Sequence, residues 1–329
     1  MSRPVVCRRL FSVGLTALAG CLSPLLTAVA AEYPTKPIRL VVPFAPGGGF
    51  EVGLRPLAQE LSQRLEQGVV IDNRGGAGGI VGTEIVARAV PDGYTLLGGS
   101  VSLASLPGLY KNLSFDPIKD FAPISVAVTS AYFLLLNASV PVTSLKELIA
   151  LSKQQPGRLQ MGSAGNGSTI HLAGEMLKSM AGIDVTQITY KGSGPAMTAL
   201  IGNEVQLMFA PTGTSLPLVN AGKIRAVAVT SVKRWAVTPA IPTVAESGLP
   251  GYEVNGWYGL LAPAKTPQAI VNKLYAETKK ALETEWITKR LSASSLEPLG
   301  LSPEASAQFI KADIARWSRV IRDAGIVKE

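Results

Sequence analysis

The sequence predicts an α/β protein in which strands and helices alternate along most of the chain. Short apolar runs of strand length recur between segments whose apolar residues follow helical spacing. This alternation is typical of α/β layers with largely parallel sheets. About nine predicted strands in roughly 300 residues exceed one ordinary domain, so we expect more than one lobe.

The predicted strands are short and mostly apolar, as expected for strands buried in a sheet. They are Ile38–Val42, Val69–Ile71, Thr95–Leu97, Ile124–Val128, Phe133–Leu136, Gln187–Tyr190, Val205–Phe209, Ala226–Val229 and Tyr258–Leu261.

Two strands end in glycine-rich loops that lead into helices. The strand Ile38–Val42 is followed by Pro43–Gly49, and the apolar spacing that continues to Leu65 then indicates a helix. The loop Asn73–Gly79 precedes a second expected helix, Ile80–Ala89. Unpaired N–H groups and the helix dipole favour an anion at such positions. The pair of loops therefore predicts a ligand that carries negatively charged oxygens.

Three later helices have recognisable starts. Ser144–Glu147 is a capping box that opens a helix ending near Gln154. Thr266 and Ser302 each precede a proline, which is typical of an N-cap followed by the first helical residue. Beyond Ser302, apolar residues at helical spacing predict an amphipathic C-terminal helix that packs onto the core.

The first 31 residues are predicted to be a signal peptide. A basic segment precedes an apolar run, and Ala28–Ala30 offers a cleavage site of small residues. The adjacent Arg8 and Arg9 fit both a twin-arginine signal and a general secretory signal. A lipoprotein-type cleavage at Cys21 is less favoured, because the residues that follow it are apolar. The expected location is the periplasm.

Composition excludes several classes of protein. Both cysteines, Cys7 and Cys21, lie in the leader, so a mature chain that begins beyond them has no disulfide and no thiolate site. The net charge of +8 falls to +5 without the three leader arginines, and the remaining charges are scattered. No basic stripe interleaved with aromatic residues indicates nucleic-acid binding.

Catalytic and cofactor motifs are absent from the sequence. His171 is the only histidine, and its place at the start of a probable helix favours a capping or packing role. No Gly-x-Ser-x-Gly elbow occurs, and neither Gly-x-Gly pair continues to the dinucleotide fingerprint. We therefore predict no catalytic residue, no metal site and no cofactor, with an α/β hydrolase or transferase as the less favoured alternative.

An ordered set of motifs resembles the periplasmic solute receptors of tripartite tricarboxylate transporters, often called Bug proteins. The set covers essentially the whole mature chain. It consists of Tyr33–Gly49, Asn73–Gly79, Pro91–Leu97, Ser163–Gly167, His171–Glu175, Tyr190–Gly192, Ala221–Thr230, Pro242–Glu246 and Trp257–Pro263.

The resemblance implies a two-lobed periplasmic-binding-protein type II fold with a central ligand cleft and two crossing strands. The first lobe would comprise residues 32–131 and 256–329, and the second would comprise residues 132–255. It also implies a monomeric receptor that passes a small carboxylate to the membrane permease subunits of a tripartite transporter. The carboxylate could be a di- or tricarboxylate or an aromatic acid. A receptor that signals to a sensor kinase is the alternative.

Polar glycine-rich loops after strand ends supply the expected ligand contacts, because open α/β sheets bind ligands there. Backbone N–H groups of Ala45–Gly49 would hold one carboxylate, and Ser163–Thr169 would hold a second polar end, over a floor of Ser100 and Ser102. The predicted ligand-binding residues are Phe44, Ala45, Pro46, Gly47, Gly48, Gly49, Phe50, Glu51, Ser100, Ser102, Ser163, Ala164, Gly165, Asn166, Ser168, Thr169 and Pro211.

The first glycine loop departs from the family's usual pattern at its end. Phe50 and Glu51 stand where members commonly have a small hydroxyl residue and then aspartate. Glu51 keeps a carboxylate that could brace the loop. The Phe50 ring could pack against an apolar or aromatic substrate, or it could pack beneath the lobe.

Overall fold

The computed structural model describes residues 33–46, 49–235, 238–294, 296–323 and 325–326, and the side chain of Glu51 lies outside this description. All the elements below belong to the compact unit Pro34–Glu329. The predicted signal peptide, its cleavage site and Cys21 lie outside the described residues.

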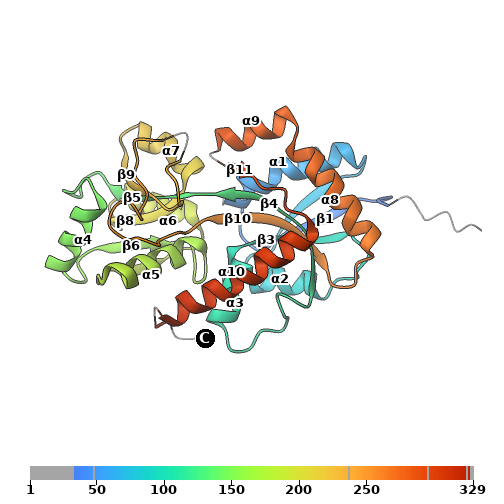
Figure 1. The fold of residues 1–329 in the computed structure, drawn as a ribbon, viewed down its shortest axis with the longest axis horizontal. Helices are drawn as coiled ribbons and strands as arrows, with labels where there is room; N and C mark the ends of the chain where they lie inside the picture. The colour runs from blue at the N-terminus through green and yellow to red at the C-terminus, as the bar shows by residue number, and fades with distance from the viewer. Residues whose placement is uncertain (1–32, 47–48, 236–237, 295, 324, 327–329) are drawn as a thin grey trace, which may run out of the picture. The chain divides into compact units, whose positions relative to one another are not determined.

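The first sheet has six strands in the order β11-β4-β10-β3-β1-β2. Its strands are β1 (Ile38–Val42), β2 (Val69–Asn73), β3 (Thr95–Ser100), β4 (Phe121–Ser130), β10 (Gly256–Pro263) and β11 (Leu296–Pro298). The helices around it in Figure 1 are α1 (Gly49–Arg64), α2 (Ile80–Ala87), which follows the short helix η1 (Ala77–Gly79), α3 (Val101–Leu109), α8 (Gln268–Leu282), α9 (Glu285–Ala293) and α10 (Pro303–Asp323).

The second sheet has five strands in the order β7-β6-β8-β5-β9. Its strands are β5 (Tyr132–Asn137), β6 (Gln160–Ser163), β7 (Thr186–Thr189), β8 (Leu207–Pro211) and β9 (Ile224–Val229). The accompanying helices are α4 (Leu145–Gln154), α5 (Thr169–Ala181), α6 (Ser193–Ile201) and α7 (Thr212–Asn220). The fold class is therefore the expected α/β arrangement with two sheets.

The chain passes between the sheets at two places. Only Ala131 separates β4 in the first sheet from β5 in the second, and the chain returns after β9 to form β10 (Figure 1). The family resemblance implies crossings near Tyr132–Phe133 and Val254–Trp257, which lie beside these connections. Assigning whole segments to two lobes, with their boundaries, stays a prediction.

Each predicted strand is present, with ends that differ by a few residues. The expectation of largely parallel sheets is wrong. β1 is parallel to β2 and β3, and β6 is parallel to β7 and β8, but β10 is antiparallel to β3 and β4, and β5 is antiparallel to β8 and β9. Strands that carry the chain between sheets are not held by a local βαβ crossover, so no such connection forces them to be parallel.

Helix starts follow the sequence signals with one exception. Ser144 Oγ accepts a hydrogen bond from the Glu147 N–H at 3.2 Å, and Ser302 Oγ accepts one from the Ala305 N–H at 3.2 Å. These contacts confirm both N-caps. Thr266 is not an N-cap, because its hydroxyl donates to the Pro263 carbonyl at 2.7 Å and the helix begins after Pro267.

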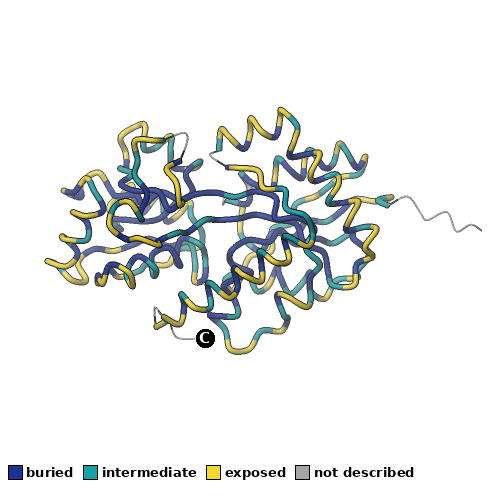
Figure 2. The backbone as a smooth tube through the Cα atoms, in the orientation of Figure 1, coloured by how far each residue is buried: buried dark blue, intermediate teal, exposed yellow. Residues whose placement is uncertain are grey.

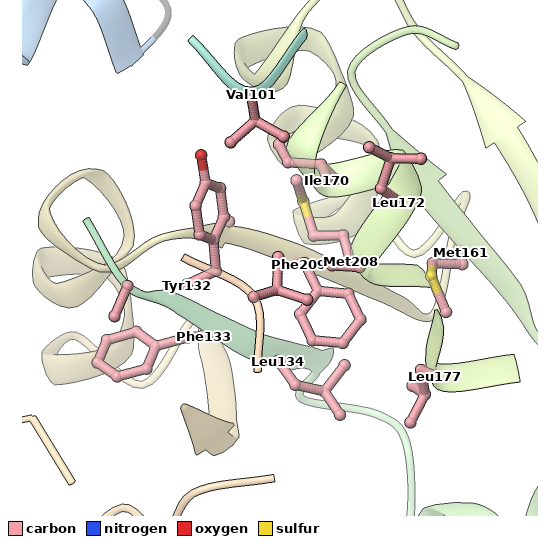
Figure 3. Packing of buried hydrophobic residues seen from close by; sticks show 14 of the residues in the cluster. Val101, Tyr132, Phe133, Leu134, Met161, Ile170, Leu172, Leu177, Met208 and Phe209 are labelled. Atoms are coloured by element: carbon pink, nitrogen blue, oxygen red, sulfur yellow. The ribbon is translucent and has the colours of Figure 1, made fainter. Parts of the chain in front are cut away.

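The largest hydrophobic cluster draws residues from both sheets. In Figure 3, Leu134 of β5 lies near its register partner Phe209 of β8, and Met161 of β6 lies near Leu177 of α5. Figure 2 shows the central strands buried and the outer sides of the helices exposed. Trp257 and Trp317 are fully buried, and the predicted C-terminal helix contributes Ile310, Ile314 and Ile321 to the core.

No helix within the described part of the chain has the length and apolar character needed to cross a membrane.

Candidate functional site

A cavity of about 770 Å³ lies at the carboxyl ends of the parallel strands. Its walls come from the loops that follow β1, β2 and β3 in the first sheet and β6, β7 and β8 in the second. Tyr132 and Tyr258, which lie on the strands next to the two crossings, complete the lining. Open α/β sheets place ligand sites at these strand ends, so the geometry fits a ligand-binding cavity.

Six helices begin at this cavity. The lining includes residues at or beside the first turns of α1, α2 and α3 on one side and of α5, α6 and α7 on the other. Side chains cap two of these starts, because Ser100 accepts from the Ser102 N–H and Ser168 accepts from the His171 N–H. The starts of α2, α6 and α7 have no side-chain cap. Each start contributes partial positive charge, so the cavity favours an anion.

The two glycine-rich loops of the first sheet are held together at the cavity. The Asn73 side-chain amide donates to the Phe44 carbonyl at 2.9 Å. A Cβ on Gly75 would lie 3.2 Å from the Ala45 nitrogen, so the loops approach closely. Successive residues from Gly76 to Gly79 have positive φ, and the Gly79 N–H donates to the Gly76 carbonyl at 2.9 Å, so this loop is a tight turn.

Most of the predicted ligand-binding residues line the cavity. These are Phe44, Ala45, Pro46, Gly49, Phe50, Ser100, Ser102, Ala164, Gly165, Ser168, Thr169 and Pro211. Gly47, Gly48 and the side chain of Glu51 lie outside the described residues. The cavity brings the rest together from both sheets, although ligand contact itself stays a prediction.

Two predicted residues are not part of the lining. Ser163 is fully buried, and its hydroxyl interacts with the Thr189 hydroxyl at 3.3 Å, so it faces β7. Side chains alternate between the two faces of the sheet along β6, and Ser163 lies beside its register partner Thr189 on a covered face. Asn166 is exposed, and its backbone carbonyl lies close to Gly78: a Cβ added to Gly78 would be 3.1 Å from that oxygen.

Phe50 packs within a group of three aromatic rings. It is 7% exposed, stacks on Phe44 with 5.4 Å between ring centroids, and meets Tyr258 edge-on at 5.0 Å. Its ring borders the cavity, but the low exposure means that the ring is mainly surrounded by residues of the first sheet and its helices. Of the two expectations for this residue, burial describes the structure better.

The sequence reasoning missed several parts of the lining. The loop 73–79 was expected to attract an anion, but its residues were not among the predicted contacts, and neither were Ile170, Tyr190–Pro195, Tyr132 and Tyr258. Tyr258 stands within the motif Trp257–Pro263, and Tyr132 stands at a predicted crossing. Their positions were visible in the sequence, but nothing there showed that their side chains point into the cavity.

The described lining has little formal charge. It contains no aspartate or glutamate, and Lys191 is its only lysine or arginine, with an exposed side chain. Burial raises the pKa of Tyr258 well above its usual value and raises the pKa of Tyr132, so both phenols stay protonated at neutral pH. An anion in this cavity would therefore meet mainly neutral donors.

His171 does not line the cavity. Its backbone N–H is capped by Ser168, and burial lowers the pKa of its imidazole. Among the described residues, no group of three or more histidine, cysteine, aspartate or glutamate side chains could hold a metal ion.

Comparison with known proteins identifies the family. The family described as the tripartite tricarboxylate transporter family receptor matches residues 54–326. Protein BugT of Bordetella pertussis is 34% identical over 311 residues, which cover 94% of each chain.

Two solved structures share the fold at high similarity. One is R. palustris Rpa4515 with adipate, with a TM-score of 0.86 and 38% identity over 90% of this chain and all of that one. The other is MatC of Rhodopseudomonas palustris with bound malate, with a TM-score of 0.82 and 32% identity over 88% of this chain and all of that one. The family is a class of solute receptors, not of enzymes. This chain belongs to the tripartite tricarboxylate transporter receptor family.

Proposed function

We propose that this protein is a periplasmic receptor that captures a small carboxylate and delivers it to the permease subunits of a tripartite transporter. The observation that carries the proposal is the convergence of six helix starts on a cavity whose described lining contains no acidic side chain. Partial positive charge at helix starts stabilises anions without an ion pair. Family membership and the adipate and malate named in two similar structures support the same ligand class.

The proposed contacts come from both sheets. Backbone N–H groups near Ala45 and Gly49 hold one carboxylate, and the start of α5 at Ser168 and Thr169 holds the other polar end of the ligand. Hydrogen bonds from neutral donors are more readily exchanged with water than a desolvated ion pair, which leaves an uncompensated charge when it breaks. A receptor that must release its cargo benefits from this difference.

The proposed working unit is a monomer of two lobes, residues 32–131 with 256–329 and residues 132–255. Ligand binding would close the lobes about the two crossings and change the surface that the permease meets, as in hinge closure generally. Residues 1–31 would direct export and then be removed, which places the receptor where solutes arrive from outside the cell.

Thermal denaturation of the mature protein, from Glu32 onward, tests this function. The panel contains adipate, malate and benzoate, each paired with its uncharged amide. A carboxylate at 100 times its dissociation constant should add about 2.7 kcal/mol of stability, while the paired amide adds much less. Equal shifts with acids and amides, or no shift with any acid in a broad panel, would contradict the proposal.

A further inference from the structure

The side chain of Tyr258 reaches the start of α1, where one carboxylate is proposed to bind. A Cβ placed on Gly49 would overlap the Tyr258 hydroxyl, and a Cβ placed on Gly53 would lie 2.7 Å from its ring. Glycine at both positions, one helical turn apart, lets the phenol lie directly against the first turns of the helix. The hydroxyl therefore stands beside the first backbone N–H groups of α1.

The Tyr258 ring is fixed in place by packing against other aromatic rings. Phe50 contacts it edge-on at 5.0 Å, Phe50 in turn stacks on Phe44, and Tyr258 is 5% exposed. Because the ring borders the cavity while most of its surface is covered, its hydroxyl is presented in a fixed direction with little entropy left to lose on binding. Aromatic packing at Phe50 thus positions a polar group.

Tyr132 brings a second hydroxyl to the same region. Its hydroxyl interacts with those of Tyr258, of Ser130 and of Thr169, the first residue of α5. In Figure 3 the Tyr132 hydroxyl points away from Phe133 and Leu134, out of the apolar cluster. A Cβ on Gly256 would lie 2.7 Å from this oxygen, so glycine there leaves room for it. The Tyr258–Tyr132–Thr169 group links the start of α1 to the start of α5.

Three serine hydroxyls of the lining have hydrogen-bond partners within the protein. The hydroxyls of Ser100 and Ser102 bond to each other at 2.8 Å. Ser168 caps α5, and Lys191 is exposed at the edge of the lining. The Ser130 hydroxyl also lies within this group, and if Ser130 donates to Tyr132 and Tyr132 donates to Tyr258, the Tyr258 proton is left for a further acceptor.

We propose that the hydroxyls of Tyr258 and Tyr132 bind a carboxylate oxygen of the ligand at the start of α1, with Tyr258 as the direct donor and Tyr132 as its partner. This inference rests on the proposed function and adds two specificity-determining residues to it. Raised pKa values keep both phenols in the neutral donor form across the physiological range.

Isothermal titration of wild type and of Tyr258→Phe with adipate, malate and benzoate tests the inference. Loss of a hydrogen bond to a charged oxygen should weaken binding about tenfold or more in Tyr258→Phe. Tyr132→Phe should weaken binding about threefold or more, because it removes a neutral partner of the direct donor.

Tyr252→Phe is the matched control. Tyr252 is also a buried tyrosine, at 1% exposed, but its hydroxyl donates to the Ala173 carbonyl at 2.8 Å and does not line the cavity. Its variant should bind the acids as wild type does. A Tyr258→Phe loss no greater than that of Tyr252→Phe overturns the inference while leaving the proposed function intact. Failure of wild type to bind any of the acids overturns the proposed function.

A spectroscopic measurement on wild type covers the case in which Tyr258→Phe does not fold. The chain has eight tyrosines, so ¹³C labelling at the ring carbon that bears the hydroxyl gives a spectrum of eight resonances. The resonance of Tyr132, assigned with Tyr132→Phe, should shift on addition of the tightest-binding acid, together with one further tyrosine resonance. Binding without a shift in any tyrosine resonance overturns the inference.

Discussion

At the scale of single residues, the stability of the fold depends on polar groups that are buried with one defined partner. The Trp257 indole N–H donates to Asp313 Oδ2 at 2.9 Å, and Arg316 Nε lies 3.5 Å from Asp313 Oδ1. This contact joins a crossing strand, β10, to the C-terminal helix. Burial raises the pKa of the Asp313 carboxyl in spite of these partners.

The raised pKa of Asp313 predicts a pH dependence of stability. From the ordinary carboxyl pKa up to the folded-state pKa, the folded protein binds more protons than the unfolded chain, so the free energy of unfolding falls as pH rises. Asp313→Asn removes this slope and retains an acceptor for Trp257. Urea denaturation of wild type and variant between pH 4 and 8 should show the variant gaining relative stability as pH rises.

Asp116→Asn is the control, because the pKa of Asp116 is shifted in the opposite direction to that of Asp313. Hydrogen bonds lower the pKa of Asp116, and the largest effect comes from the backbone N–H of Ile118. The contribution of this carboxylate to folding stability is therefore present above the ordinary carboxyl pKa and is lost as pH falls below it. As pH rises toward the ordinary value of 3.8, the Asn variant should therefore lose stability relative to wild type, so this pair is measured below pH 4. A slope of the same sign in both variants would show that at least one of the two carboxyls does not behave as described.

At the scale of elements, helix starts determine both local structure and the site. The capping box of α4 shows this for a helix away from the cavity. Ser144 accepts from the Glu147 N–H, and Glu147 Oε2 accepts from the Thr143 N–H at 2.7 Å. Side chains satisfy the Glu147 N–H inside the first turn and the Thr143 N–H just before the N-cap, and the sequence alone displays the Ser–x–x–Glu pattern.

Ser144→Ala should lower the free energy of unfolding by about 1 kcal/mol, because the Glu147 N–H loses its acceptor. Ser144→Asp should retain most of the stability, since aspartate also caps helices and is favourable at a helix start. Chemical denaturation measures both. Carboxylate affinity should stay unchanged, because Ser144 does not line the cavity. Equal stability of Ser144→Ala and wild type would contradict the capping role.

Elements with strong local signals were predictable, and those defined by distant contacts were not. Strand β1 and the cap of α4 follow from apolar runs and spacing. Strand β6 was not predicted, because Gln160–Ser163 has only one apolar side chain. It is a strand because it pairs with its neighbours β7 and β8. The directions of β5 and β10 depend on how the chain crosses between sheets, which no local pattern encodes.

The same division applies to the site. Backbone anion sites such as the one proposed at Ala45–Gly49 can be predicted from the sequence, because they are glycine-rich loops that follow strands. The contribution of Tyr258 is not, because it depends on space left by Gly49 and Gly53 in another element. Ser163 shows the opposite error, since a polar residue at a strand end was expected to face the ligand and instead faces β7.

In the whole molecule, helix dipoles and hydroxyls together form the proposed anion site. Helix starts from both sheets meet there, and the described lining offers one exposed lysine as its only fixed positive charge. Such a site binds a carboxylate through several moderate interactions. It thus combines selectivity for charge with ready release.

A crystal structure of the mature protein with the most stabilising acid of the panel tests this claim most directly. We expect a carboxylate at the start of α1, within hydrogen-bonding distance of the Tyr258 hydroxyl, with the rest of the ligand extending toward the start of α5. No lysine or arginine nitrogen should lie within about 4 Å of that carboxylate. A ligand paired with Lys191, or bound outside the cavity, would contradict the account.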